Sequence, residues 1–293
     1  MAEALLSVDG LHKSYGSVAA VAGASLDVYA GEIVCLVGPN GSGKTTLIEC
    51  IEGLRTPDAG RITLFGDRAG GRRERAALMG VQLQEEGLPA RIRVGEAVRL
   101  FAAIYGVESP PDELITQLGL DELVRRPFET LSGGQKRRTA LALAFINDPR
   151  LAILDEPSAG LDPQGQDEIV SIIKERAAGG AGLLVTTHDM QVAADISDRV
   201  VVIRSGRTLA AGTPDELLAG IPFEWCLAGP GLERVTEGAV IAQDGRNTRI
   251  YGTSEELEHI IDSLPATRRA RVTLRRTDLS DVAFHVEDRA VER

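Results

Sequence analysis

The eight residues 38–45, which read Gly-Pro-Asn-Gly-Ser-Gly-Lys-Thr, decide the fold of this chain. They match the phosphate-loop pattern GxxxxGK[ST], in which glycines let several backbone N–H groups point at one phosphate and the next helix adds its positive dipole. Lys44 is expected to reach the β- and γ-phosphates, and the Thr45 hydroxyl is expected to bind Mg²⁺. The expected nucleotide contacts are Gly38, Pro39, Asn40, Gly41, Ser42, Gly43, Lys44, Thr45 and Thr46.

The sequence on both sides of this loop predicts an α/β fold of the P-loop NTPase type. The apolar run 33–37 reads as a buried strand before the loop, and a helix is expected to begin near Lys44. Two more apolar strands, LAILD at 151–155 and GLLVTT at 182–187, enclose a helical segment. This alternation is typical of a parallel sheet with flanking helices.

Two further segments extend this core. Residues 5–28 alternate apolar and polar side chains in short pieces separated by glycines, which predicts an antiparallel β layer. Apolar residues recur at helical spacing after Ile92, so a helical subdomain is expected over about 85–135.

The composition changes after Leu218, where prolines, glycines and short strand-like pieces replace the regular alternation of strands and helices. One helix is predicted there, over 254–263. We therefore expect a nucleotide-binding domain over 1–219 and a small α+β accessory or regulatory module over 220–293.

Two adjacent carboxylates end the strand LAILD. Asp155 is suited to hold Mg²⁺ through water, and Glu156 is suited to orient and polarise the attacking water, because phosphoryl transfer depends on positioning and charge stabilisation. A solvated acidic strand end is the alternative interpretation, and the phosphate loop upstream makes it less attractive.

The pentapeptide Leu-Ser-Gly-Gly-Gln at 131–135 lies between the loop and this carboxylate pair. In this order the three motifs resemble the nucleotide-binding domain of ABC transporter ATPases. The resemblance implies a dimer in which the pentapeptide of one subunit completes the ATP site of the other. The residues that it assigns to the partner's nucleotide are Ser132, Gly133, Gly134 and Gln135.

The resemblance extends to four single residues along residues 1 to about 218. Tyr15 resembles the aromatic residue that stacks on adenine, although a tyrosine at a strand edge is the structural alternative. Gln84, with Gln82 as its competitor, resembles the glutamine that senses Mg²⁺ and the γ-phosphate. Asp162 resembles the aspartate that communicates across the dimer. His188 resembles the histidine that contacts the γ-phosphate, although a lone histidine after a strand is more often structural.

The resemblance thus implies ATP and Mg²⁺ as ligands. It places Glu156, His188 and Gln84 in catalysis, and Thr45, Gln84 and Asp155 at the metal.

The charge and composition of the chain limit the classes of partner that it can have. The net charge of −11 argues against a general affinity for nucleic acid, and no apolar run is long enough to span a bilayer. The first residues lack the features of a secretory signal, so the cytoplasm is the expected location. Three scattered cysteines predict reduced, buried thiols rather than disulfides or a zinc site; they are Cys35, Cys50 and Cys226.

The resemblance also implies what the ATPase drives. Its partners would be a second copy or a related ATPase chain, together with a separate membrane permease at whose cytoplasmic face the dimer works. The run LSGGQKRR, the run VQLQEEGLP and the C-terminal extension are similar to the ATPases of bacterial drug and antibiotic exporters. A non-transport ABC ATPase that acts on ribosomes or DNA is the alternative.

The C-terminal module also carries a group of arginines in an otherwise acidic chain. A solvated strand face is the simplest interpretation, with a regulatory or dimer-stabilising surface, or attraction to an anionic membrane, as alternatives. These residues are Arg268, Arg269, Arg271, Arg275 and Arg276.

Overall fold

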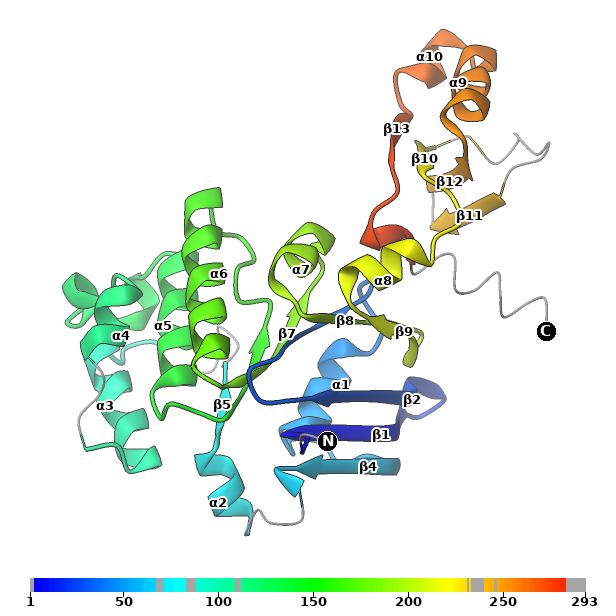
Figure 1. The fold of residues 1–293 in the computed structure, drawn as a ribbon. Coiled ribbons are helices and arrows are strands. Elements are labelled where there is room, and N and C mark those ends of the chain that lie inside the picture. Colours follow the sequence, from blue (N-terminus) through cyan, green and yellow to red (C-terminus); the bar gives the residue numbers. More distant parts are fainter. Residues whose placement is uncertain are drawn as a thin grey trace. The chain divides into compact units, whose positions relative to one another are not determined.

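The computed structural model describes residues 3–66, 71–82, 88–108, 112–230, 232, 240–244 and 247–282. The chain forms two compact units, Met1–Ala211 and Gly212–Arg293, each with its own sheet and apolar core (Figure 1). None of the helices in the described ranges has both the length and the apolar character that crossing a bilayer requires. The predicted buried thiols are confirmed for Cys35, Cys50 and Cys226.

The centre of the first unit is a six-stranded sheet, and its buried strands are the apolar runs of the sequence. The order is β5 (Met79–Val81), β6 (Leu151–Asp155), β7 (Gly182–Thr187), β3 (Ile33–Val37), β8 (Arg199–Arg204) and β9 (Arg207–Gly212). The strands from β5 to β8 pair in parallel. Because parallel sheets are covered on both faces, β3 and β7 are buried at every position, which confirms the predicted fold class.

Helices surround this sheet. They are α1 (Lys44–Ile51), α2 (Arg72–Ala77), α5 (Gly133–Phe145), α6 (Pro163–Ala178) and α7 (Met190–Ile196). Helix α1 places Leu47, Ile48 and Ile51 in the same apolar cluster as Val34 and Leu36 of β3. This packing anchors the loop between β3 and α1 at both ends.

The predicted antiparallel layer is confirmed as a three-stranded sheet. Its order is β2 (Val18–Val28), β1 (Leu6–Tyr15) and β4 (Ala59–Leu64). In Figure 1 this blue layer lies on the other side of the unit from the green helices α3 and α4.

Those green helices belong to the predicted helical subdomain. It contains α3 (Val94–Tyr105), α4 (Asp112–Gln117) and two 3₁₀ turns, Asp121–Leu123 and Phe128–Thr130, before α5 begins. Val94, Ala97 and Val98 of α3 are buried as their spacing predicts. Ile104 continues the same spacing, but its side chain is not buried. It is 65% exposed, and Leu100, one turn earlier, is 47% exposed.

The second unit is a small α+β module. Its four-stranded sheet has the order β11 (Val240–Asp244), β12 (Asn247–Gly252), β10 (Trp225–Gly229) and β13 (Thr273–Arg276), and its helices are α8 (Pro214–Ala219), α9 (Ser254–Ser263) and α10 (Ala266–Arg269). The predicted helix over 254–263 is confirmed as α9, which Thr253 caps by accepting a hydrogen bond from Glu256 N. The contacts between residues place α8 in this second unit, which begins at Gly212. The change of amino-acid composition along the sequence instead places residues 214–219 at the end of the nucleotide-binding domain.

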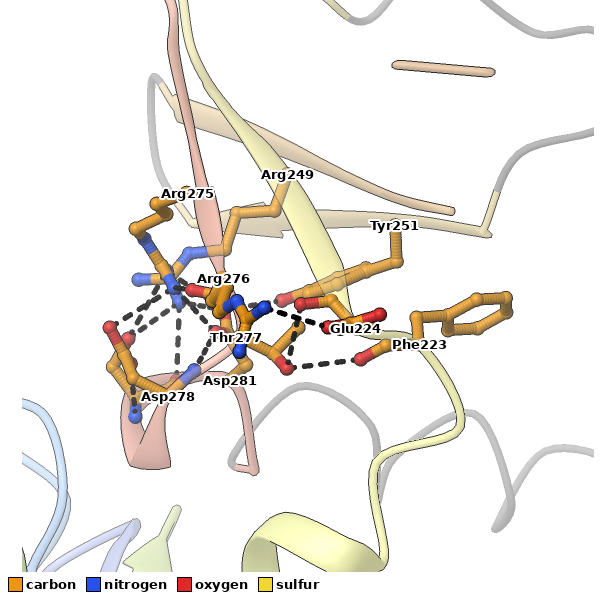
Figure 2. A network of polar contacts seen from close by, with 10 residues as sticks. Phe223, Glu224, Arg249, Tyr251, Arg275, Arg276, Thr277, Asp278 and Asp281 are labelled. Carbon is orange, nitrogen blue, oxygen red and sulfur yellow. Dashed lines mark hydrogen bonds and ion pairs between the residues drawn. The ribbon is translucent and has the colours of Figure 1, made fainter. Parts of the chain in front are cut away.

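A buried carboxylate holds the turn after β13 against the sheet of the second unit (Figure 2). Asp281 is fully buried and accepts hydrogen bonds from Arg249 Nη1 at 2.7 Å and Tyr251 Oη at 2.9 Å. Arg275 binds it through two nitrogens, at 2.7 and 3.0 Å, and the backbone N–H of Asp278 donates at 2.8 Å. Burial alone would raise the pKa of Asp281, but the hydrogen bonds from Arg275 and Asp278 hold that pKa below its ordinary value.

The five arginines do not form one strand face, because only Arg275 and Arg276 lie on β13, but Arg268, Arg269, Arg271 and Arg276 are exposed. Arg275 is half-buried and pairs with Asp281, Arg276 pairs with Glu224 and lies over the Trp225 ring, and Arg269 lies on α10 and pairs with Asp262. The partners of Arg276, Glu224 and Trp225, are distant along the chain, so the sequence alone does not show them.

The Asp281 network yields a prediction for stability. Asp281→Ala leaves two guanidinium groups without their shared carboxylate, so we expect the second unit to lose about 3–5 kcal/mol of unfolding free energy. Trp225 is the only tryptophan of the chain and lies in this unit, so its fluorescence during urea unfolding reports this transition. Glu255→Ala, at an exposed position of α9, is the matched control. An unchanged Trp225 transition in Asp281→Ala would contradict the prediction.

Candidate functional site

The loop between β3 and α1 is a tight backbone cradle. A Cβ atom on Gly38 would lie 2.1 Å from the carbonyl oxygen of Ile203, and one on Gly43, whose φ is +104°, would lie 2.3 Å from that of Ala20. These positions therefore require glycine. The Ser42 hydroxyl oxygen is buried and has no hydrogen-bond partner. A glycine cradle with an orphaned hydroxyl fits a phosphate group.

Lys44 lies inside this cradle. It is 8% exposed, and its Nζ donates hydrogen bonds to the backbone oxygens of Gly38 at 2.7 Å and Pro39 at 3.1 Å. Burial lowers the pKa of Lys44, while the negative charges of Glu156 and Asp155 oppose that shift. The lysine thus lies close to both carboxylates of the LAILDEP segment.

A cavity of about 380 Å³ brings together two of the three predicted metal ligands. Thr45, from the start of α1, and Asp155, from the end of β6, both line it. The third, Gln84, lies outside the described residues. Its competitor Gln82 lines the same cavity, is 7% exposed, and has a buried side-chain oxygen without a hydrogen-bond partner.

Glu156 and His188 meet beside this cavity. His188 Nδ1 lies 3.0 Å from Glu156 Oε1, so the two predicted catalytic side chains are in contact. Glu156 has a φ of +48°, in the left-handed region that residues other than glycine rarely adopt. His188 is held just before α7, which Asp189 caps by accepting hydrogen bonds from two backbone N–H groups.

Thr186, which the sequence analysis does not single out, joins this group from β7. It lies opposite Asp155 in the sheet register, and its hydroxyl donates a hydrogen bond to the Asp155 carboxylate. The Glu156 N–H donates to the same hydroxyl at 3.0 Å. The feature of the sequence that could have indicated Thr186 is the pair of threonines at the end of the otherwise apolar segment GLLVTT.

The LSGGQ segment lies at a different hollow. Ser132 caps α5 by accepting a hydrogen bond from Gln135 N, and the Gln135 side chain accepts one from Ser132 N, so the N-terminus of α5 is well formed. A hollow of about 790 Å³ is lined by Ser132, Gly133, Gly134, Gln135 and Asp162. No phosphate-loop residue lines it within the described part of the chain. A single chain therefore keeps its loop and its LSGGQ segment apart.

Two predicted residues have local roles in the structure. Asp162 caps α6 by accepting a hydrogen bond from Gly165 N at 2.9 Å. Tyr15 ends β1 and is 43% exposed, which leaves part of its ring available for stacking. Lys13 Nζ and the Arg55 guanidinium lie 5.8 and 5.9 Å from the ring centroid.

The remaining predicted residues of the phosphate loop are at least partly accessible. Thr46 is half-buried in α1, and Pro39, Asn40 and Gly41 are exposed.

Comparison with known proteins identifies the family. The family model described as ABC transporter matches residues 21–159. A Nod factor export ATP-binding protein I from Rhizobium johnstonii is 32% identical over 302 residues, which cover 98% of this chain and 96% of that protein. The chain belongs to the ABC transporter ATPases.

Other relatives of this ABC ATPase agree with that placement. The daunorubicin resistance ATP-binding protein DrrA3 of Streptomyces coeruleorubidus is 36% identical over 228 residues, which cover 75% of this chain and 71% of that protein. A solved ATP-binding subunit of an ABC transporter superposes with a TM-score of 0.68 and 31% identity, covering 73% of this chain and 92% of that one. The chain is thus an ATP-binding subunit that hydrolyses ATP.

The cavity of this ABC ATPase contains a further carboxyl group with unusual titration. Burial of Glu52, together with the nearby charges of Asp155 and Glu49, raises its pKa to about 7. Because the folded protein keeps this proton at a pH where the unfolded chain has released it, stability falls as pH rises from about 4.5 through 7.

The Glu52→Gln variant removes this ionisation. At pH 8 the nucleotide-free, metal-free variant should be more stable than wild type by on the order of 2 kcal/mol, with allowance for partial solvent screening. Near pH 4.5 the two proteins should be about equally stable. Urea unfolding at both pH values measures the difference, with Glu129→Gln, an exposed carboxylate outside this cavity, as the control. A stability difference that does not change with pH would contradict the assignment.

Proposed function

We propose that this ABC ATPase is the ATP-hydrolysing subunit of an exporter and works as a dimer of two copies beneath a separate membrane permease. The observation that carries the dimer is the separation of the loop cavity from the LSGGQ hollow within one chain. Each ATP would then be enclosed between the loop of one copy and the N-terminus of α5 in the other.

Within one copy, the loop N–H groups and the Ser42 hydroxyl would bind the phosphates. Lys44 would exchange its two backbone oxygen partners for phosphate oxygens, which restores its hydrogen bonds and adds a favourable charge interaction. Thr45 and Asp155 would hold Mg²⁺, together with Gln84, because hydroxyl and carboxylate oxygens suit this ion. The ion would neutralise charge on the β- and γ-phosphates.

Glu156 would orient and polarise the attacking water, and His188 would fix the Glu156 carboxylate and contact the γ-phosphate. From the other copy, Ser132, Gly134 and the positive end of α5 would bind the same phosphate. Tyr15 would stack on adenine, and Asp162 would lie near the dimer contact. Loss of the γ-phosphate removes contacts that only the closed dimer makes, so hydrolysis would let the dimer reopen.

Export rests on the relatives. The compared proteins are named as Nod factor export and daunorubicin resistance ATP-binding proteins, and these names give no support to a role on ribosomes or DNA. The exposed Leu100 and Ile104 on α3 offer an apolar surface suited to a permease at the cytoplasmic membrane face. The match to the Rhizobium johnstonii protein covers nearly the whole chain, so we assign the C-terminal unit an accessory role within the transporter.

The catalytic assignment predicts a trapped dimer. Glu156→Gln should retain ATP binding while hydrolysis slows about 10²- to 10⁴-fold, because the amide cannot polarise water as the carboxylate does. Light scattering with ATP should then show a stable dimer. Lys44→Ala should instead lose nucleotide affinity in calorimetry. Hydrolysis at the wild-type rate by Glu156→Gln would refute the assigned role.

A nucleotide site shared between two copies predicts that a large side chain at Gly133 slows ATP hydrolysis. A Cβ there meets no atom within 4 Å in its own chain, whereas one at Gly134 would approach the Leu161 side chain to 2.8 Å. Gly133→Trp should therefore fold normally but block the partner's nucleotide and reduce turnover about a hundredfold.

Gly133→Ala is the matched control and should turn over near the wild-type rate. Thermal unfolding checks that both variants fold, and ATPase assays together with ATP-dependent dimerisation of the Glu156→Gln background measure closure. Full turnover and closure in Gly133→Trp would show that the site is not shared between two copies.

A further inference from the structure

Thr186 is a fully buried hydroxyl in a strand that is otherwise apolar up to that point. It is 0% exposed on β7, where Val185 precedes it and where a side chain of valine shape would fill the same space. Burying a hydroxyl is unfavourable unless it is hydrogen-bonded. Thr186 makes two such bonds, and both go to the segment that carries the predicted metal ligand Asp155 and the predicted catalytic residue Glu156.

The two hydrogen bonds have a defined polarity. A hydroxyl has one proton, which Thr186 donates to Asp155 Oδ1, so a lone pair of the same oxygen accepts the N–H of Glu156. One oxygen of the Asp155 carboxylate is thereby fixed by the protein. Asp155 also lines the cavity that it shares with Thr45.

The same hydroxyl acts on the strained residue of the site. The Glu156 N–H is shared between the carbonyl oxygen of Thr186 at 3.1 Å and the Thr186 hydroxyl at 3.0 Å. A left-handed φ of +48° persists only when surrounding contacts hold it. In this conformation the Glu156 carboxylate reaches His188 at 3.0 Å.

We propose that Thr186 is a positioning residue for ATP hydrolysis, whose hydroxyl fixes the metal-binding carboxylate of Asp155 and the backbone of Glu156 relative to each other. The inference rests on the proposed roles of these two carboxylates. It adds a residue from the neighbouring strand that couples them, in the way that outer hydrogen bonds commonly orient metal ligands.

The test compares Thr186→Val, which keeps the shape and removes the hydroxyl, with Thr186→Ser, which keeps the hydroxyl. At saturating Mg²⁺, Thr186→Val should lower kcat about ten- to hundredfold. Its KM for ATP should stay within about twofold of wild type, since the loop that binds the phosphates is untouched. Thr186→Ser should restore most of kcat.

A second readout does not depend on turnover. Mn²⁺ binding to the ADP-loaded protein, followed by electron paramagnetic resonance, should weaken about tenfold in Thr186→Val and remain near wild type in Thr186→Ser. If both variants match wild type in kcat and Mn²⁺ affinity, the inference is overturned. A loss that Thr186→Ser does not restore also overturns it, because the hydroxyl would then not be the active group.

Wild type and Glu156→Gln are assayed alongside. If Glu156→Gln hydrolyses ATP at the wild-type rate, the proposed function of the carboxylates fails, whatever Thr186 does. If Glu156→Gln is inactive and Thr186→Val is fully active, only the positioning role of Thr186 fails.

Discussion

The parallel register of β3, β7 and β6 is the constraint on which the site depends. Val37, the last residue of β3, pairs with Thr187, and Asp155, the last residue of β6, pairs with Thr186. Because these strands run in the same direction, their carboxyl ends meet at one edge of the sheet. The phosphate loop, the carboxylate pair and His188 all begin where a strand ends at that edge. A shift in register would separate them.

The site is built from groups that are unfavourable on their own, and the core stabilises them. Lys44 is buried, Ser42 has an orphaned hydroxyl, Glu52 resists ionisation, and Glu156 has a left-handed backbone. Each feature lowers the stability of the isolated chain, and most of them would be relieved by a bound polyanion and its cation. The neighbouring apolar cluster around Leu36 provides the rigid support that such strain requires.

The second unit is stabilised by apolar packing on one face of its sheet and by charged groups on the other. Its sheet is too small for a large core, and one face packs on α9 through Leu227, Ile250 and Leu257. The other face is closed by a charge network centred on Asp281 instead of by apolar side chains alone. Removing one member of a buried ion pair is costly, so the network specifies where the turn after β13 must lie.

The sequence alone determined the features that are local in the chain. The glycine loop, the strands that flank it and the helix Ser254–Ser263 all depend on neighbouring residues, so their patterns can be read directly. The resemblance to the family, and with it the expected ATPase activity, followed from the order of the phosphate loop, the LSGGQ segment and the carboxylate pair along the chain.

Only the tertiary structure decided the rest. The bonds between Thr186 and Asp155, and those between Arg249 and Asp281, join residues about thirty positions apart, and helical spacing could not show that Ile104 faces solvent. Long-range pairing depends on sheet register and on which face of an element is covered. Composition and local pattern do not contain that information.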